Sequence, residues 1–460
     1  MEKKSVLVKY KLAIPIIVLV GILITVLAYM MDENAGPDEI LRIKVVNWIV
    51  ENNRLPTGFE EELIDPIWGF SYAFTPYLPL MFASLIVKVA SWFTLSVHTL
   101  LFAARLVNVL VGMGTVFVAF RVADKLMDNK YSVYFFVSLV ACLPQFIFLA
   151  GYLNNDAMSL LTGFMILDAV LEGARDKWNN KNMVYLSVGI ALCMLTYYFG
   201  YGWILFAIVG YFYTSFKSSG DRKTIFKKAG MIVLLVFILA GWYFIRNAII
   251  YKGDFLGYTA QKLCAEAYSL KHGTMIVNNP GRNTMHLRDM LYRGGWIELT
   301  LQSFIGMFGG MVICLDGKFY DLYCLAFLGS VFFFVLYRHK TRRKLEPVLL
   351  TMLLFEIVFP IFFSIYSSYT RDFSPQGRYV ISILPSLCVL AAMGIDELSK
   401  AVTEKFTGII WASKLGKLIP VIAALFLVAV FVIIFYTVML PTLTFTILPG
   451  SDKVSFYYVR

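Results

Sequence analysis

The sequence predicts an all-α polytopic membrane protein, and three observations lead to this fold class. The chain of 460 residues is 59% hydrophobic and 16% aromatic, with only 15% charged residues and a mean hydropathy of +0.71. Apolar runs of about 20 residues, long enough to cross a hydrocarbon core of about 30 Å, recur along it. Basic residues gather in short segments between these runs. A soluble globular protein is therefore excluded, and the net charge of +11 indicates orientation in a membrane, not binding to nucleic acid.

Eleven apolar runs are predicted to span the membrane, with the N-terminus on the cytoplasmic side. This orientation follows the positive-inside rule, because it places every basic cluster on the cytoplasmic side and leaves the C-terminus outside. The first run has no small-residue cleavage site, so it is expected to stay as an anchor. The predicted spans are residues 12–30, 99–120, 132–150, 157–172, 183–197, 202–216, 229–250, 318–337, 347–366, 378–397 and 418–439. The basic clusters are residues 3–11, 121–130, 175–181, 222–228, 338–344 and 400–417.

Two further apolar runs, 77–93 and 301–315, are predicted to lie at the outer interface without crossing. A crossing by 77–93 would carry Lys88 near mid-membrane at a cost of about 2.5–3.5 kcal/mol. It would also move the next basic cluster outside. The run 301–315 is too short and too rich in glycine to cross. The spans 183–197 and 202–216 are short, and we expect them to form a hairpin that is broken between them.

The two longest segments between spans, 31–76 and about 251–300, are both external in this threading. The first holds nine acidic and three basic residues. Within it, residues 38–53 show the apolar spacing of an amphipathic helix that lies in the membrane interface. A Gly-Pro pair turns the chain just before this helix. The adjacent acids Asp38 and Glu39 are therefore predicted to lie at the outer membrane surface.

Charged residues at the outer ends of several spans are predicted to converge on one polar cavity. Charges within apolar spans are costly and usually face such a cavity. Arg105 lies six residues inside its span, a depth of about 9 Å at a rise of 1.5 Å per residue. Asp156 immediately precedes the span 157–172. The remaining candidates are Asp38, Glu39, Lys88, Arg246 and Arg378.

Each of these residues also has a purely structural interpretation. Asp38 and Glu39 suit the first turn of any helix, and Asp156 can cap the helix that follows it. The basic residues near span ends can extend toward lipid headgroups. Glu356, near the middle of the span 347–366, is expected to form a structural ion pair.

The order and sidedness of these residues resemble the GT-C superfamily of membrane glycosyltransferases, which use polyprenyl-phosphate sugars. The resemblance starts with the Asp-Glu pair before an interfacial helix and with "NNDAMSLLTGFMIL" after the third span. The segments "GWYFIRNAIIYKGDFLG", "LQSFIGMFGG" and "SPQGRYVISILP" are closer to a bacterial branch related to the protein O-mannosyltransferase and aminoarabinose transferase families. The resemblance covers residues from about 10 to about 400. It implies a GT-C fold in three parts. Residues 1–250 form a seven-span module, which contains a catalytic loop at 31–98. Residues 251–317 form an external loop with an interfacial or re-entrant helix, and residues 318–460 form a variable transmembrane module.

The resemblance implies transfer of a sugar from a polyprenyl-phosphate donor to an acceptor outside the cytoplasm, which is a glycan, a lipid or a protein. Asp38 is implied as the general base, with Glu39 supporting it and Asp156 as a second acid of the cavity. Arginine suits the donor phosphate because its planar fork binds bidentately. The candidate residues for binding the donor phosphate are Arg246, Arg378, Gln376, Tyr379, Lys88 and Arg105.

The residue types favour a site without a metal or another cofactor. Some members of the superfamily hold a divalent cation between two acidic motifs, whereas "NND" offers one carboxylate, so a divalent metal stays an alternative to the expected metal-independent site. The sequence leaves open whether Cys264 and Cys314 pair outside the membrane. Two other functions are left open by the sequence. The protein would be a flippase or transporter of a lipid-linked glycan, or a non-catalytic assembly protein with the same fold.

Overall fold

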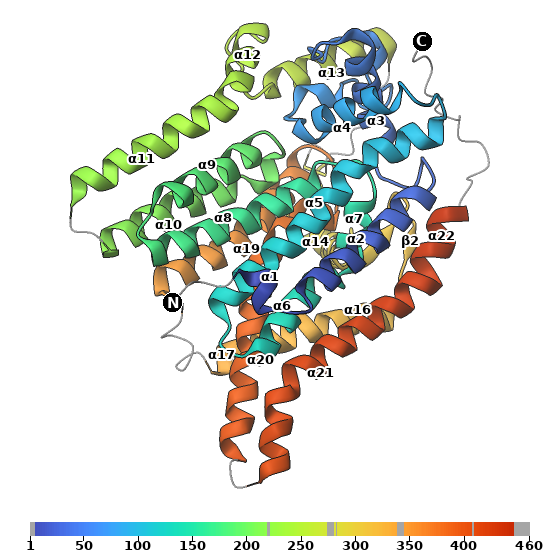
Figure 1. Cartoon of the computed structure of the whole chain (residues 1–460). Coiled ribbons are helices and arrows are strands. Elements are labelled where there is room, and N and C mark those ends of the chain that lie inside the picture. Colours follow the sequence, from blue (N-terminus) through green and yellow to red (C-terminus); the bar gives the residue numbers. More distant parts are fainter. Residues whose placement is uncertain are drawn as a thin grey trace.

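The computed structural model describes residues 5–218, 221–273, 280–281, 283–337, 345–406 and 409–445. Within these residues the regular elements are all helical apart from one short antiparallel hairpin, in which β1 (Met307–Phe308) pairs with β2 (Ile313–Cys314). The predicted all-α polytopic class is confirmed (Figure 1). The basic cluster 338–344 and the last residues at both chain ends lie outside the described residues.

The first part of the chain is a spanning helix, a long connecting segment with two helices, and a long returning helix. Its elements are α1 (Val6–Lys9), α2 (Ala13–Met30), α3 (Glu39–Asn52), η1 (Glu61–Leu63), η2 (Tyr72–Phe74), α4 (Leu78–Ala90) and α5 (Val97–Leu126). Helix α2 is apolar on most of its surface, as expected for a helix that contacts lipid. Helices α3 and α4 pack against each other, and α4 packs on α5.

The middle of the chain forms a compact group of helices around α8. Its elements are α6 (Lys130–Ala141), α7 (Pro144–Gly151), α8 (Asp156–Asp176), α9 (Asn180–Met194), η3 (Tyr198–Gly200), α10 (Gly202–Ser218), α11 (Arg222–Val236), η4 (Phe237–Gly241) and α12 (Trp242–Ile250). Helices α6 and α7 are bent by 56° relative to each other. Pro144 begins α7, and it explains the bend because proline cannot continue a helix from the preceding residues.

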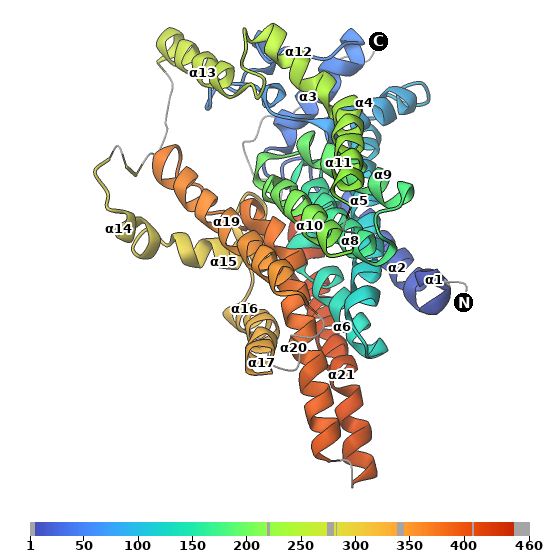
Figure 2. The same ribbon diagram turned by 90° about the vertical axis from the view of Figure 1, so that its left-hand side faces the viewer.

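The last part contains further spanning helices and several shorter helices, among them α13. Its helical elements are α13 (Tyr258–His272), α14 (Leu287–Tyr292), α15 (Trp296–Gly306), α16 (Gly317–Cys324), η5 (Leu325–Gly329), α17 (Ser330–Leu336), α19 (Pro347–Thr370), η6 (Gly377–Ile383), α20 (Leu384–Lys405), α21 (Ile410–Ile434), η7 (Phe435–Met439) and α22 (Leu440–Phe445). Helices α20 and α21 form a long hairpin that projects from the rest of the molecule (Figures 1 and 2).

The predicted number of spans is not confirmed. Nine helices in the described part of the chain are long and apolar enough to cross a membrane, and the bent pair α6–α7 gives up to ten. Helix α9, predicted as a span, has only 15 residues. The break expected between α9 and α10 is present as the short turn η3. The run 77–93 forms the 13-residue helix α4, as expected for a segment that does not cross, whereas 301–315 combines the end of α15 with the β1–β2 hairpin.

Helices α5 and α8 form the buried centre of the bundle, and both run in the same direction. Helix α5 packs against α2, α4, α6 and α8, and α8 packs against α9 and α10 as well. At the ends of α5 and α8 far from α3, Arg121 and Lys125 form ion pairs with Asp168 and Glu172. The basic end of this pair of helices is therefore held together by charge, and the opposite end lies beside the loop that begins α3.

The predicted segregation of loops appears as two opposite ends of the molecule. Helices α3, α4, α12 and α13 gather at one end, and the end of α20 and the start of α21 lie at the other (Figures 1 and 2). The first end carries the segments predicted to be external, and the second carries a cluster predicted to be cytoplasmic. Which of the two ends faces the cytoplasm stays a prediction from the charge pattern.

Labelling of single cysteines tests this orientation. Leu270 on α13 is 89% exposed, and Lys414 on α21 is also exposed. In a Cys314→Ser background, which removes an exposed native thiol, we expect an impermeant maleimide added outside intact cells to label Leu270→Cys. It should label Lys414→Cys only after permeabilisation, because basic loops stay on the cytoplasmic side. The reverse pattern would invert the orientation.

Candidate active site

The turn between α2 and α3 brings Asp38 into an unusual backbone conformation. Gly36 packs directly on the ring of Tyr152, since a Cβ atom added at Gly36 would lie 2.6 Å from that ring. Asp38 is the N-cap of α3 and has a φ of 59°, in the left-handed region. Aspartate tolerates this region better than most residues. A non-glycine residue held in such a conformation is a candidate for a functional role.

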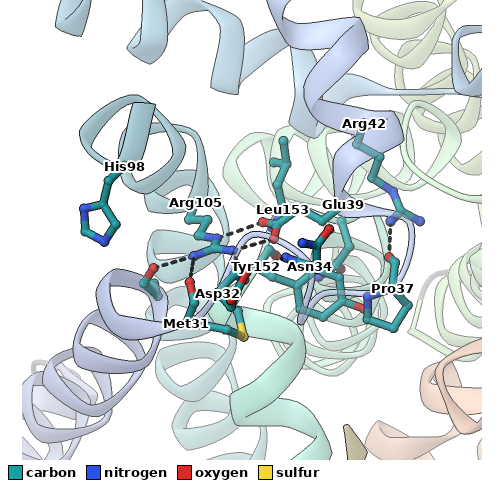
Figure 3. A network of polar contacts seen from close by, with 12 residues as sticks. Met31, Asp32, Asn34, Pro37, Glu39, Arg42, His98, Arg105, Tyr152 and Leu153 are labelled. Atoms are coloured by element: carbon teal, nitrogen blue, oxygen red, sulfur yellow. Dashed lines mark hydrogen bonds and ion pairs between the residues drawn. The ribbon is translucent and has the colours of Figure 1, made fainter. Parts of the chain in front are cut away.

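Glu39 and Arg105 form a buried ion pair beside this turn (Figure 3). Arg105 Nε donates to Glu39 Oε1 at 2.9 Å, and Arg105 Nη2 donates to Glu39 Oε2 at 2.6 Å. The exposed fractions of the two side chains are 0% for Glu39 and 1% for Arg105. Arg105 also donates to the carbonyl oxygens of Ala28, Met31 and Asp32 at 2.7 to 3.0 Å.

These contacts correct the role predicted for Arg105. A guanidinium group has five N–H donors, and the five hydrogen bonds above use all of them. Arg105 therefore holds the end of α2 against the start of α3, and it has no donor left for a lipid phosphate. Glu39 accepts a further hydrogen bond from the backbone N–H of Leu153 at 2.8 Å. Glu39 therefore supports Asp38 structurally, because its contacts fix the position of the backbone at the start of α3.

Asp38 points away from this network and pairs with Arg378 of η6. Arg378 Nη2 donates to Asp38 Oδ2 at 2.6 Å and to the hydroxyl of Tyr379 at 3.2 Å. Arg42, one helical turn after Asp38, lies 3.9 Å from the same carboxylate oxygen and donates to the carbonyl of Pro37 at 2.8 Å. The side chains of Arg378 and Arg42 are each 6% exposed. The site thus contains two buried guanidinium groups around one carboxylate.

The electrostatic environment keeps Asp38 ionised. Burial alone would raise the pKa of Asp38, but the guanidinium groups of Arg378 and Arg42 outweigh this effect. Hydrogen bonds from Arg378 and from the hydroxyl of Tyr72 stabilise the charged form further, and the pKa falls to about 2. The ring of Tyr72 also lies 5.0 Å from the guanidinium group of Arg42.

Several buried polar atoms around Asp38 lack a hydrogen-bond partner among the described residues. They are Arg42 Nε, Arg378 Nε, Asp156 Oδ1 and the hydroxyl of Tyr152. Asp156 begins α8, is 2% exposed, and interacts electrostatically with both arginines and with Asp38. Buried polar atoms are usually paired, so this group of atoms indicates a place where a polar ligand completes the hydrogen bonds.

The pair Asp38–Arg378 lies in the wall between two cavities. One cavity has a volume of about 420 Å³ and is lined mainly by residues 36–41 together with Gln376 and Arg378. The other has a volume of about 560 Å³, and it also contains Asp38, Gln376 and Arg378 in its lining. The aromatic residues that line the second cavity are Trp68, Phe70, Tyr72, Tyr197, Phe199, Tyr258 and Tyr379. Gln376 lines both cavities and Tyr379 lines the second, and their role in binding a donor phosphate stays a prediction.

Arg246 and Lys88 lie apart from this site. Arg246 lines neither cavity, and its Nη2 donates to the carbonyl oxygens of Leu55 and Pro56 at 3.1 and 2.7 Å. Lys88 Nζ donates to the carbonyl of Val50 at 2.9 Å, in the last turn of α3. Both cations hold the backbone of the external loop. The predicted meeting of Arg246 and Arg378 at one anion is replaced by the meeting of Arg42 and Arg378.

The donor atoms at Asp38 do not fit a divalent cation. The carboxylates near one another are those of Asp38 and Asp156, and two guanidinium groups act on both. No group of three or more His, Cys, Asp or Glu side chains placed to hold a metal is found in the part of the chain that the structure describes. A cation there would repel Arg42 and Arg378 at short range.

Two questions away from the site are answered by the structure. The sequence left open whether Cys264 and Cys314 pair, and both are free thiols. Glu356 on α19 is 0% exposed, and neither carboxylate oxygen has a hydrogen-bond partner among the described residues. The expected ion pair is therefore not formed. A Cβ atom at Gly202 would lie 2.6 Å from Glu356 Oε2, which shows how closely the carboxyl group packs against α10.

Sequence comparison assigns the chain to a family. The model described as "Predicted membrane protein (DUF2142)" matches residues 49–387. The chain belongs to this family. Asp38 and Arg42 precede the matched residues, whereas Asp156 and Arg378 lie within them. No curated protein matches the chain by sequence.

Structure comparison shows that this DUF2142 protein has the GT-C fold. It is similar to the apo oligosaccharyltransferase of Archaeoglobus fulgidus, with a TM-score of 0.56 and 14% identity over 96% of this chain and 57% of that one. It is also similar to ArnT from Cupriavidus metallidurans bound to undecaprenyl phosphate, with a TM-score of 0.50 and 13% identity over 94% of this chain and 73% of that one. The DUF2142 chain thus spans little more than half the length of the archaeal enzyme.

The ion pair between Glu39 and Arg105 is expected to carry much of the stability of the external loop. Glu39→Gln leaves the Arg105 charge buried and unpaired, which costs about 3–5 kcal/mol in comparable pairs. We expect a large drop in the thermal unfolding midpoint of the purified protein. The matched control is Glu346→Gln, which breaks the exposed pair with Lys217 and should cost only about 0–1 kcal/mol. Equal midpoints for Glu39→Gln and Glu346→Gln would contradict this role.

Proposed function

We propose that this DUF2142 protein is an integral-membrane glycosyltransferase that moves a sugar from a polyprenyl-phosphate donor to an acceptor on the extracytoplasmic side. The observation that carries the proposal is the Asp38–Arg378 pair at 2.6 Å in the wall shared by two cavities. This pair places a carboxylate, which can accept a proton, beside a guanidinium group, which can hold a phosphate. Each has access to a separate space for one of two substrates.

The proposed reaction is a single displacement with inversion at the anomeric carbon. An acceptor hydroxyl oxygen forms the new bond to that carbon while its proton passes to Asp38. The bond between the carbon and the donor phosphate breaks, and the phosphate leaves with the electron pair. Arg378 and Arg42 neutralise the charge that develops on the phosphate. Because a phosphate leaves without protonation, one carboxylate is enough, unlike the two carboxylates of a glycosidase.

Arg378 links donor binding to the strength of the base. Its guanidinium group holds the pKa of Asp38 low in the protein without substrate. A donor phosphate competes with Asp38 for the same guanidinium group and adds negative charge nearby. Both effects raise the pKa of Asp38 toward a value more suitable for a base. In this proposal the base becomes effective when the donor is in place.

The ligands of the structural neighbours support a lipid-phosphate donor. ArnT was solved with undecaprenyl phosphate, and the archaeal oligosaccharyltransferase AglB was solved with dolichol-phosphate and an inhibitory peptide. The acceptor of this chain is proposed only by class, as a glycan, a lipid or a protein. The reaction is proposed to need no metal, because the arginines supply the positive charge at the phosphate.

Substitution of Asp38 tests the catalytic role. Asp38→Asn is nearly isosteric and removes the base, so transfer from a polyprenyl-phosphate sugar by the purified protein should slow by a factor of about 10²–10⁴. Asp289→Asn is the control, since Asp289 lies on α14 and pairs with Arg293 at the surface. It should keep the rate of the unchanged protein. Full activity in folded Asp38→Asn would remove the base from the mechanism.

Substitution of the arginines tests which of them bind the phosphate. Hydrogen bonds to a charged group are worth about 1.5–3 kcal/mol, so Arg42→Gln and Arg378→Gln should each weaken binding of undecaprenyl phosphate by about tenfold or more. Arg246→Gln should leave the affinity near that of the unchanged protein, because Arg246 binds backbone carbonyls. A larger loss in Arg246→Gln than in Arg42→Gln would restore the pairing predicted from the sequence.

A further inference from the structure

A third cavity lies beside the aromatic cavity of the active site and is about twice its volume. It measures about 1170 Å³, compared with about 560 Å³. Its walls come from residues 59–64 of the first external loop, residues 250–256 after α12, and one face of α13. These segments lie at the same end of the molecule as α3 (Figures 1 and 2). The cavity is too large for one sugar and has no part in the proposed reaction.

Tyr258, the first residue of α13, lines both cavities, which otherwise lie on different faces of this helix. The guanidinium group of Arg371, which lines the active-site cavity, lies 4.3 Å from the ring centre of Tyr258. A linear molecule with one end at Asp38 would therefore continue past Tyr258 into the larger cavity.

Aromatic rings are the main recognition groups in this cavity. They belong to Phe59, Tyr251, Phe255, Tyr258 and Tyr268. Phe59 and Phe255 are 49% and 54% exposed, so their surfaces are available to a ligand. Neighbouring rings hold some of them in place, since Phe59 packs edge-on against Phe74 at 5.0 Å and Tyr268 stacks on His272 at 4.3 Å. The C–H faces of sugar rings pack well on the electron-rich faces of such side chains.

The charges of the cavity select against other ligands. Glu61 and Asp254 balance Lys252 and Lys271, and Glu61 lies 3.3 Å from Lys271. Balanced charges give no net attraction for a polyanion. Four charged side chains also make the cavity unfavourable for a lipid tail. Hydroxyl groups, in contrast, form hydrogen bonds with charged groups of either sign.

We propose that this cavity binds the non-reacting part of a neutral glycan acceptor several sugars long. The assignment rests on the proposed function, because it takes the glycan to be the substrate that attacks the donor. The terminal sugar lies at Asp38, the chain passes Tyr258, and the following sugars stack on the rings of the larger cavity. The site therefore selects an acceptor by its length and by its lack of charge.

Binding to an array of neutral and anionic oligosaccharides of graded length tests this proposal with the full-length purified protein. The unchanged protein should bind neutral chains of several sugars and should not bind monosaccharides. Phe255→Ala and Tyr268→Ala should each weaken this binding by about tenfold while undecaprenyl phosphate still binds normally. Phe93→Ala is the matched control, because Phe93 is 83% exposed and lies outside the cavity. It should bind glycans like the unchanged protein.

The outcomes separate this proposal from the proposed function. No glycan binding by the unchanged protein, preference for anionic glycans or for a peptide, or unaltered binding by both cavity variants would overturn the assignment of the cavity. Asp38→Asn should still bind the neutral glycans, because the base does not hold the distal sugars. If glycans bind in the cavity but folded Asp38→Asn transfers sugar at the full rate, the proposed mechanism fails and the binding site stands.

Discussion

The buried ion pair between Glu39 and Arg105 is the interaction on which the rest of the site depends. Charges at this depth are tolerated only when their hydrogen-bonding groups are used, and Arg105 uses all five N–H groups on Glu39 and on carbonyls at the end of α2. The pair determines where the first span ends and where α3 begins. Asp38 directly precedes Glu39, so the same ion pair positions Asp38. The backbone of Asp38 is in the left-handed region, and its carboxylate accepts a hydrogen bond from Arg378.

The sequence predicted the architecture well where one physical rule decides, and less well where two compete. Hydropathy and charge together predicted a helical membrane bundle, and the charge of Lys88 and of the next basic cluster kept α4 outside the set of spans. The count of eleven is not confirmed, since α9, which charge parity required to cross, has only 15 residues, fewer than the roughly 20 of a usual span. The bend between α6 and α7 was missed, although Pro144 lies inside the predicted span 132–150 and marks a break in sequence terms.

The same contrast holds for the site. Asp38 and Arg378 were predicted to share one face of the membrane, and the structure brings them into contact. The depth of a residue along a span can be predicted from the sequence, but the direction in which its side chain points cannot. The sequence also does not show which cations form hydrogen bonds with backbone carbonyls. The contacts of Arg105 and Arg246 with backbone carbonyls could not be predicted for this reason. Arg42 had a usable signal, since a residue four positions after Asp38 on a helix lies on the same face.

The site also collects the N-terminal ends of helices, and this follows from how the chain is threaded. Helix α3 starts after Asp38, α8 starts at Asp156, and η6 carries Arg378 into the start of α20. Unpaired N–H groups give each helix start a partial positive charge. Spans that run in the same direction present these ends on one side of the membrane, so this side gains positive potential from the backbone itself. That potential favours the ionised form of Asp38 and adds to the attraction of Arg42 and Arg378 for a phosphate. The positive potential at this end therefore arises from the topology as well as from the arginines.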